Sequence, residues 1–379
     1  MLTGGGTGGH ITPIIAVARE LKQLNPDCFI VYVGERGGQF AHLTNDVPEI
    51  DEVRTIFAGK FRRYYGESWL TRLLDIQTNL LNLRDLFLFG FGLLQSLFLV
   101  KRINPDVVFL KGGFVGVPIG LCSALWHKNI VTHDSDALPG LANRLVSRWV
   151  ACHATGMPAK FYNYPAEKAT YVGVLVSSEY QPVNATTLRK LKSTVGALPD
   201  STVLLVTGGS LGSQRLNTAM KQLTPVLLDT YPGLQIIHQV GKGNESVYQD
   251  YVHDRLEVLE FLKPMYAYTG AADVVVTRAG ANTLAELGVQ GKACIVVPNP
   301  LLSGGHQLKN AAYLKEQNAV LVVDDVGLKK RTTELDTAIR SLLNDGALRE
   351  NLQKKLRSLT VHDAANKLAV ILLEQAESK

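Results

Sequence analysis

Two glycine-rich turns, roughly 200 residues apart, constrain the fold of this chain more than any other feature. The first is TGGGTGGH at residues 3–10, and an apolar pattern with helical spacing follows it at residues 14–24. The second is GGSLGS at residues 208–213, preceded by the apolar strand pattern TVLLVT. Glycine lets backbone N–H groups approach a ligand closely, and a following helix adds partial positive charge. The pattern therefore predicts an α/β fold of two Rossmann-like domains with parallel sheets.

The other apolar runs support this division. A chain of 379 residues is too long for one ordinary core. We expect domains at residues 1–176 and 177–355, and a C-terminal helix within 356–379 that could pack back on the N-terminal domain. The expected strands are 28–33, 106–110, 129–132, 202–207, 234–240, 256–261, 272–277, 293–297 and 319–323, and a last strand of the first half should end near 171–176. The expected helices are 14–24, 115–126, 211–228, 281–289, 308–316, 332–343 and 364–376. Only two residues precede the first turn, so its strand is short or the true start lies upstream.

Net charge and cysteine content limit the kinds of ligand and binding partner that we expect for this chain. The net charge is +5, which fits an anionic partner such as a nucleotide or an acidic membrane surface. No basic cluster interleaved with aromatic residues matches a recognisable nucleic-acid-binding module, so we expect no nucleic-acid partner. The 4 cysteines are scattered without metal-ligand spacing, which favours free thiols in a reducing cytoplasm and no zinc site. No signal peptide is recognisable, and the longest apolar run, Leu86–Val100, is shorter than the roughly 20 residues of a bilayer span.

The segment from Arg54 to Arg102 is basic and unusually apolar. Apolar residues recur there at alternating steps of four and three, which predicts one continuous helical face: Trp69, Leu73, Ile76, Leu80, Leu83 and Phe87. We favour a helix packed on the sheet. The alternative is a membrane-facing patch in the preceding loop, formed by basic residues with Phe61, Tyr64, Tyr65 and Trp69. The two interpretations are compatible if the helix is buried against the sheet and the preceding loop is exposed.

The densest group of polar residues is TRAGANTLAE at residues 277–286. Backbone N–H groups at the start of the helix after Gly280 would suit a phosphate, and Glu286 could accept hydrogen bonds from two ribose hydroxyls. The alternative is an ordinary capping box of Thr283 and Glu286. Neither glycine-rich turn has the full dinucleotide-binding context, and no GxxxxGK[ST] or GxSxG motif occurs.

Two further polar clusters follow predicted strands. Gln307, in the run GGHQ, offers a donor and an acceptor for sugar hydroxyls, although a polar helix start explains it equally well. The sequence HDSD at residues 133–136 contains an Asp-x-Asp pair that could hold a divalent metal. Asp and Ser are also common in turns and caps, and we favour that interpretation.

With these pieces assembled, the chain resembles the MurG glycosyltransferases, which add N-acetylglucosamine to undecaprenyl-linked muramyl peptide in bacteria. The likeness spans nearly the whole chain. The motifs that carry it are TGGGTGGHITP, NPDVVFLKGGFVGVPIG, VTGGSLGSQRLN, LEFLKPM, ADVVVTRAGANTLAEL and GGHQLKNAAYL, in this order. The resemblance implies the GT-B fold, in which two Rossmann-like domains face each other across a cleft. It places the donor, UDP-N-acetylglucosamine, on the C-terminal domain and the lipid acceptor on the N-terminal one.

The resemblance also implies roles for individual residues. His10 would be the catalytic base, and Ser210 would contact the nucleotide phosphates. The other implied substrate-binding residues are Thr7, Gly8, Gly9, Asp136, Leu262, Ala281, Asn282, Thr283, Leu284, Ala285, Glu286 and Gln307. Transfer would be a single inverting displacement that needs no cofactor and no metal, at the cytoplasmic face of the membrane, with the protein bound peripherally.

Two departures from the family pattern bear on the acceptor. Asp136 replaces an amide of the usual His-Glu-Gln-Asn, and Ser177 replaces an arginine near the domain junction, for which Arg278 or Lys242 could compensate. We therefore keep three alternatives: a GT-B transferase for another lipid, a UDP-sugar 2-epimerase, and a non-catalytic UDP-sugar-binding protein.

Overall fold

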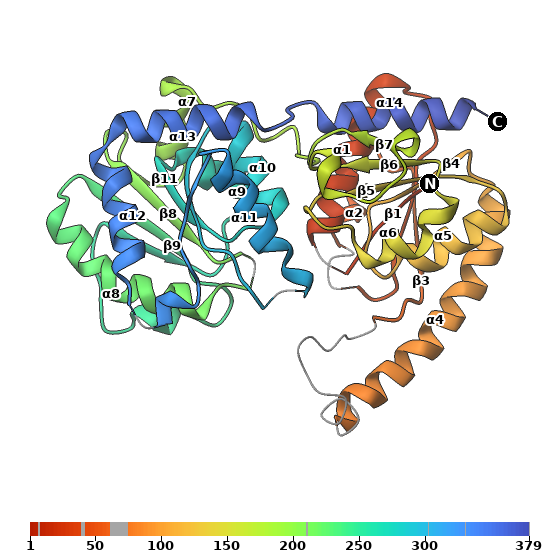
Figure 1. Ribbon diagram of the computed structural model, residues 1–379, viewed down its shortest axis with the longest axis horizontal. Helices are drawn as coiled ribbons and strands as arrows, with labels where there is room; N and C mark the ends of the chain where they lie inside the picture. Colours follow the sequence, from red (N-terminus) through yellow and green to blue (C-terminus); the bar gives the residue numbers. More distant parts are fainter. Residues whose placement is uncertain are drawn as a thin grey trace. The chain divides into compact units, whose positions relative to one another are not determined.

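The structure is a computed structural model that describes residues 1–6, 8–38, 42–60, 75–209, 211–301, 303–329 and 331–378. The chain forms two compact units (Figure 1). Unit 1 comprises Met1–Ser177 together with His362–Lys379, and unit 2 comprises Ser178–Val361. The fold class predicted from the sequence, two Rossmann-like α/β domains with parallel sheets, is confirmed.

Unit 1 is built on a parallel sheet of 7 strands in the order β3-β2-β1-β4-β5-β6-β7. Its strands are β1 Leu2–Thr3, β2 Val31–Glu35, β3 Glu52–Ile56, β4 Val107–Leu110, β5 Asn129–Asp134, β6 Cys152–Thr155 and β7 Ala169–Tyr171. Its helices are α1 Gly8–Leu24, α2 His42–Asn45, α4 Ile76–Ile103, α5 Gly116–Leu125, α6 Leu141–Val146 and α14 Ala364–Glu377. β1 lies between β2 and β4 although it has only 2 residues, so a central strand of this sheet is very short.

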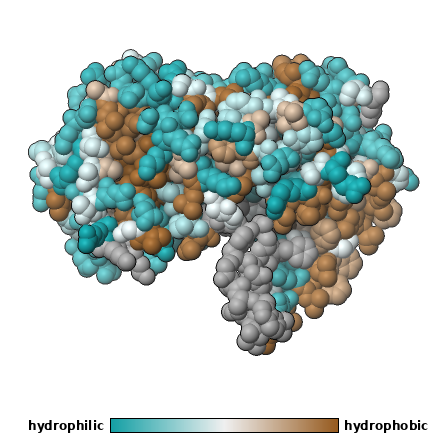
Figure 2. All heavy atoms as spheres, in the orientation of Figure 1, coloured by the Kyte–Doolittle hydropathy of each residue, from teal (hydrophilic) through white to brown (hydrophobic). Residues whose placement is uncertain are grey.

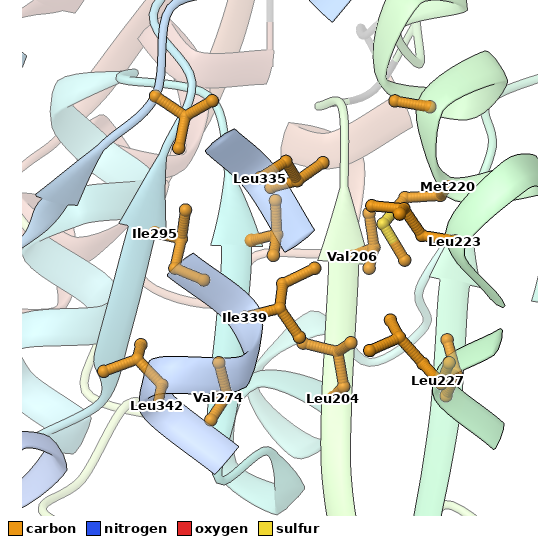
Figure 3. Close-up of a cluster of buried hydrophobic side chains, with 14 of the residues drawn as sticks. Leu204, Val206, Met220, Leu223, Leu227, Val274, Ile295, Leu335, Ile339 and Leu342 are labelled. Atoms are coloured by element: carbon orange, nitrogen blue, oxygen red, sulfur yellow. The ribbon is translucent and has the colours of Figure 1, made fainter. Parts of the chain in front are cut away.

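Unit 2 repeats this architecture with 6 parallel strands in the order β10-β9-β8-β11-β12-β13. Its strands are β8 Thr202–Thr207, β9 Leu234–Gln239, β10 Leu256–Leu259, β11 Val274–Thr277, β12 Ala293–Val296 and β13 Leu321–Val322. Its helices are α7 Ala185–Thr194, α8 Gln214–Thr230, α9 Met265–Ala271, α10 Ala281–Gln290, α11 His306–Glu316, α12 Thr333–Asn344 and α13 Gly346–Ser358. On one face of the sheet, side chains of α8 and α12 pack against the strands; Figure 3 shows Leu227 and Ile339 beside Leu204.

The inner strands of both sheets follow the rule that continuous apolar runs form strands buried on two faces. In unit 2, Val203 and Leu205 belong to one core cluster, while Leu204 and Val206 belong to the other. Residues of α14 pack on unit 1: Leu368 and Leu372 are buried, and the Asn366 amide donates to Glu20 Oε2 at 2.9 Å.

The prediction for the segment before β4 is wrong in one respect. The expected helix exists as α4, but the residues predicted for its packed face are exposed: Ile76, Leu80, Leu83 and Phe87 are between 52% and 68% exposed. The buried residues of α4 are Asp85, Gly92, Ser96 and Val100. A Cβ on Gly92 would lie 2.0 Å from the carbonyl oxygen of Phe57, so α4 packs through a surface of small residues that admits close backbone contact.

Apolar residues gather along the exposed surface of α4, at the lower right of Figure 2. We call this set the α4 stripe: Ile76, Leu80, Leu83, Leu86, Phe87, Phe91, Leu94 and Phe98, all more than 50% exposed. With 28 residues, α4 is also long and apolar enough to cross a membrane by length and composition, contrary to the estimate from the apolar run alone. The predicted aromatic patch, Phe61 to Trp69, lies outside the described residues.

Candidate functional site

In unit 1, the candidate residues meet where neighbouring strands end. His10 lies in the first turn of α1, which follows β1, and Lys111 directly follows β4. The backbone N–H of Lys111 donates to the Thr3 carbonyl at 2.9 Å, which holds the two strand ends together. Ligands of open α/β sheets bind at the carboxyl ends of the strands, so His10 occupies the expected edge. Gly8 and Gly9 begin α1, and Thr7 lies outside the described residues.

A second glycine pair, Gly112–Gly113, packs against the first glycine-rich turn. Gly113 has φ +81°, and a Cβ there would lie 2.4 Å from the Gly5 carbonyl oxygen. Gly112 has φ +105°, and a Cβ there would lie 3.8 Å from both His10 Nε2 and Asn143 Oδ1. The glycines therefore leave an open space bordered by the imidazole and the Asn143 amide oxygen, which is buried without a hydrogen-bond partner.

The environment of His10 keeps its imidazole neutral. Burial and, to a smaller extent, the nearby Lys111 ammonium together lower the pKa of His10 to about 4. At neutral pH the ring is therefore unprotonated and able to accept a proton. A general base is most effective at neutral pH when its own pKa lies near 7. With a pKa of about 4, His10 is a weaker base than that.

The HDSD motif forms the neighbouring turn after β5. Both carboxylate oxygens of Asp134 accept hydrogen bonds: Oδ1 from the Gly140 N–H at 2.7 Å and the Asn143 amide at 3.0 Å, and Oδ2 from the Tyr164 hydroxyl at 2.8 Å. This is the turn-forming role that the sequence favoured for the motif. Among the described residues, no group of three or more His, Cys, Asp or Glu side chains could hold a metal ion. Asp136 is half-buried on the same turn.

In unit 2, the second glycine-rich turn is tied to its neighbours. The Gln239 amide donates to the carbonyls of Gly209 and Glu260, each at 3.0 Å. Ser213 caps α8, and its hydroxyl accepts from the Leu216 N–H at 3.3 Å. Ser210 lies outside the described residues. Leu262, which follows β10, is 7% exposed.

The helix that carries Glu286 does not begin with a capping box. The N-cap of α10 is Gly280, which makes no side-chain cap hydrogen bond, and Thr283 lies inside the helix. The capping interpretation of Thr283 and Glu286 is therefore wrong. Ala281, Leu284 and Ala285 are buried and anchor the first turns of the helix.

Glu286 instead forms a hydrogen bond with the Tyr180 side chain. Burial raises the pKa of Glu286 to about 7, and the Tyr180 hydrogen bond partly opposes this shift by stabilising the carboxylate. Tyr180 is 8% exposed, and its ring packs edge-on against Tyr266 at a centroid distance of 6.4 Å. The carboxylate is thus held by a rigid phenol and titrates near neutral pH.

Gln307 and Arg278 have partners that sequence reasoning did not foresee. Gln307 is 7% exposed, and its Oε1 accepts from the Asn299 N–H at 2.9 Å, which orders the turn before α11. Arg278 donates to Asp325 Oδ1 at 2.6 Å and to the Ser213 hydroxyl. Asp325, 1% exposed, also pairs with Arg215. Arg278 is therefore engaged within unit 2 rather than presented as a free cation that replaces the arginine missing at Ser177.

Three of these partners, Lys111, Tyr180 and Asp325, were missed from the sequence. Tyr180 and Asp325 act on residues 106 and 47 positions away, and no local pattern marks such pairs. The sequence does contain a pattern that could have identified Lys111: a basic residue at the end of an apolar strand pattern, directly before two glycines.

Comparisons with known proteins agree with this architecture. The N-terminal domain of glycosyltransferase family 28 matches residues 1–155, and its C-terminal domain matches residues 203–368. The chain is 31% identical over 383 residues to the UDP-N-acetylglucosamine–N-acetylmuramyl-(pentapeptide) pyrophosphoryl-undecaprenol N-acetylglucosamine transferase of Natranaerobius thermophilus, covering 98% of each chain. The enzyme of the same name from Desulfitobacterium hafniense is 31% identical, with 99% of each chain covered.

A solved structure extends this likeness to the fold. The crystal structure of MurG from Acinetobacter baumannii superposes with a TM-score of 0.71 at 24% identity, covering 99% of each chain. At this identity the match concerns the fold alone.

Proposed function

This chain belongs to the MurG family within glycosyltransferase family 28, and we propose that it transfers N-acetylglucosamine from UDP-N-acetylglucosamine to undecaprenyl-diphosphate-linked N-acetylmuramyl peptide. The observation that carries the proposal is the likeness, over almost the whole chain, to curated enzymes named for this reaction. The site residues fit it because each unit presents its candidate residues at the carboxyl ends of its strands.

We assign the donor to unit 2. The N–H groups at the start of α10, which follows Gly280, would bind a phosphate, with the helix dipole adding to the attraction. Glu286 would accept hydrogen bonds from ribose hydroxyls, and Gln307 would contact the sugar. Leu262 would hold the uracil through its backbone, and Ser210 would contact the diphosphate. Charge that develops on the departing UDP would then be stabilised by oriented N–H groups.

We assign the acceptor to unit 1 and general-base catalysis to His10. The acceptor hydroxyl attacks the anomeric carbon, its proton passes to the imidazole, and the bond to UDP breaks, which inverts the configuration. His10 is neutral at pH 7, as this step requires. The space beside Gly112 would admit the hydroxyl next to the imidazole.

The test is incubation of the protein with labelled UDP-N-acetylglucosamine and the muramyl-peptide lipid. We expect labelled lipid product, and a loss of several orders of magnitude in His10→Ala with binding of the UDP-sugar retained. Transfer to another lipid alone would contradict the proposed acceptor. Release of an epimer without acceptor would identify a 2-epimerase, and sugar binding without turnover would identify a binding protein.

We further propose that the protein acts peripherally at the cytoplasmic face of an anionic membrane, through the α4 stripe. The stripe runs along a helix whose most apolar window is only 17% buried, and Lys101 and Arg102 lie at its C-terminal end. Apolar side chains flanked by basic residues are typical of helices that lie in a membrane interface.

Co-sedimentation with anionic liposomes tests the membrane proposal. Serine at Leu83, Phe87 and Leu94 should sharply reduce pelleting, whereas serine at the exposed Val252 of unit 2 should not. Parallel substitution of Phe61, Tyr64 and Tyr65 measures the contribution of the preceding loop. Unchanged pelleting of the triple α4 variant would remove the stripe from the proposal.

A further inference from the structure

The side-chain amide of Gln239 lies at the carboxyl edge of the sheet of unit 2. Gln239 is the last residue of β9, which lies between β8 and β10, and it is 3% exposed. The register pairs it with Thr207 on β8 and with Leu259 on β10, the last residues of those two strands. Gln239 is therefore placed among the turns that follow three neighbouring parallel strands, where ligands of such sheets bind.

Both ends of this amide are hydrogen-bonded. Its Oε1 accepts from the Thr207 hydroxyl, and its Nε2 donates to the carbonyls of Gly209 and Glu260, each at 3.0 Å. Two carbonyls can only accept hydrogen bonds, so they fix which end of the amide carries the N–H groups. One buried side chain thus joins the turn after β8 to the segment after β10.

Further contacts hold the same segments together. The Gly209 carbonyl also accepts from the Gly212 N–H at 2.8 Å, which closes the glycine-rich turn. The turn after β9 packs on this turn, because a Cβ on Gly241 would lie 2.5 Å from the backbone nitrogen of Gly212. Glu260 accepts a second hydrogen bond at its Oε1, from the Gly243 N–H at 2.8 Å. The turns after β8, β9 and β10 therefore form one junction, which the buried amide bridges.

The proposed donor site uses two parts of this junction. Ser210, assigned to the diphosphate, directly follows Gly209, and Leu262, assigned to the uracil, lies two residues after Glu260. In UDP the uracil and the diphosphate are joined through one ribose. The spacing of the two protein segments must therefore match the spacing of the two ligand groups, and a mismatch of the order of 1 Å is costly.

We propose that Gln239 is a positioning residue of the donor site: its amide sets the spacing between the turn at Gly209 and the segment 260–262, so that one UDP contacts both. This inference rests on the proposed function, which supplies the assignments of Ser210 and Leu262. A site that is already ordered binds more tightly, because less conformational freedom is lost on binding. The amide should therefore matter for ligands that span both segments and little for ligands that contact one.

The test compares UDP with uridine, which carries the uracil and the ribose but no phosphate. Gln239→Met keeps a side chain of similar length and removes the donors and the acceptor. We expect it to weaken UDP binding about tenfold in calorimetry, with uridine binding, measured by NMR titration, nearly unchanged. In the transfer assay, the KM for UDP-N-acetylglucosamine should rise while the KM for the lipid acceptor stays the same.

Gln235→Met is the matched control. Gln235 lies on the same strand at its other end, where its Oε1 accepts from the Leu198 N–H at 2.7 Å and from the Ser201 hydroxyl at 2.6 Å. This variant should bind UDP as the parent protein does. Thr207→Val is nearly isosteric and removes only the hydroxyl that donates to the Gln239 amide, so it tests the bridge even where Gln239→Met folds poorly.

The outcomes separate this inference from the proposed reaction. UDP binding that is unchanged in both Gln239→Met and Thr207→Val refutes the inference, and so does an equal loss for UDP and uridine. A parent protein that shows the selective loss of UDP binding in these variants but transfers no sugar to the muramyl-peptide lipid refutes the proposed reaction and supports the role of Gln239. A parent protein that does not bind UDP refutes both.

Discussion

If Glu286 binds the donor as proposed, donor binding has a pH dependence that can be calculated. Burial raises the pKa of this carboxyl to about 7, so its ionised fraction is about one in eleven at pH 6 and about ten in eleven at pH 8. A carboxylate accepts hydrogen bonds from ribose hydroxyls more strongly than a protonated carboxyl. If the ionised form alone binds well, the affinity for donor should fall about tenfold from pH 8 to pH 6, or about 1.4 kcal/mol.

Isothermal titration calorimetry with UDP-N-acetylglucosamine measures this effect. The sugar nucleotide is a suitable probe because neither phosphate of its esterified diphosphate changes protonation between pH 6 and pH 8. Glu286→Gln keeps a hydrogen-bond acceptor without the charge, so its affinity should be weaker at pH 8 and nearly independent of pH. An equal affinity of the parent protein at pH 6 and pH 8 would refute the assignment of Glu286 to the donor.

A Tyr180 variant provides a second test of the role of Glu286 in the same calorimetry experiment. Its phenol stabilises the ionised form of Glu286, so Tyr180→Phe should move the midpoint of the pH dependence upwards while keeping the ring that packs on Tyr266. The matched control is Tyr268→Phe on α9, because no interaction between Tyr268 and Glu286 contributes to either pKa. A midpoint that is the same in both variants would separate Tyr180 from the function of Glu286.

Three further predictions concern stability. Gly92→Ala places a Cβ 2.0 Å from the Phe57 carbonyl oxygen and should destabilise unit 1 by about 1–3 kcal/mol in urea unfolding, whereas Gly90→Ala on the same helix meets nothing within 4 Å and should be neutral or stabilising. Asp325→Asn leaves Arg278 and Arg215 without their shared buried carboxylate and should cost about 3–5 kcal/mol; a loss below 1 kcal/mol would contradict the pairing. Burial lowers the pKa of His238 to about 3, so its stabilising contribution is complete above about pH 6.5 and declines as the pH falls towards 3. That decline amounts to about 2 kcal/mol at pH 5, and urea unfolding of His238→Gln should show a flatter pH dependence there.

The strands were predictable because parallel strands buried on both faces appear as continuous apolar runs. The pattern at 234–240 became β9 at Leu234–Gln239, and 293–297 became β12 at Ala293–Val296. The last strand of the first half was expected to end near residues 171–176, and β7 ends at Tyr171, before Gly173 adopts φ +92°. α1 begins at Gly8 rather than residue 14, since the turn passes directly into the helix.

The surface of α4 could not be predicted from periodicity alone. Spacing shows which residues share a helix face, but not whether that face meets protein, solvent or membrane. Here the apolar face is exposed, and the packed face contains Gly92 and Ser96. Likewise, the motifs located His10 and Glu286, but the side chains that modify their pKa values in addition to burial, Lys111 and Tyr180, come from other segments.

The path of the chain through the two units has a consequence for biosynthesis. Unit 2 is a single continuous stretch, Ser178–Val361, inserted into unit 1 before α14. Domains generally fold as units during synthesis, N-terminal parts first. Unit 1 is not complete in that order, because Leu368 and Leu372 are buried in it and are translated only after all of unit 2. Until α14 is translated, the surface of α1 that α14 contacts lacks this partner.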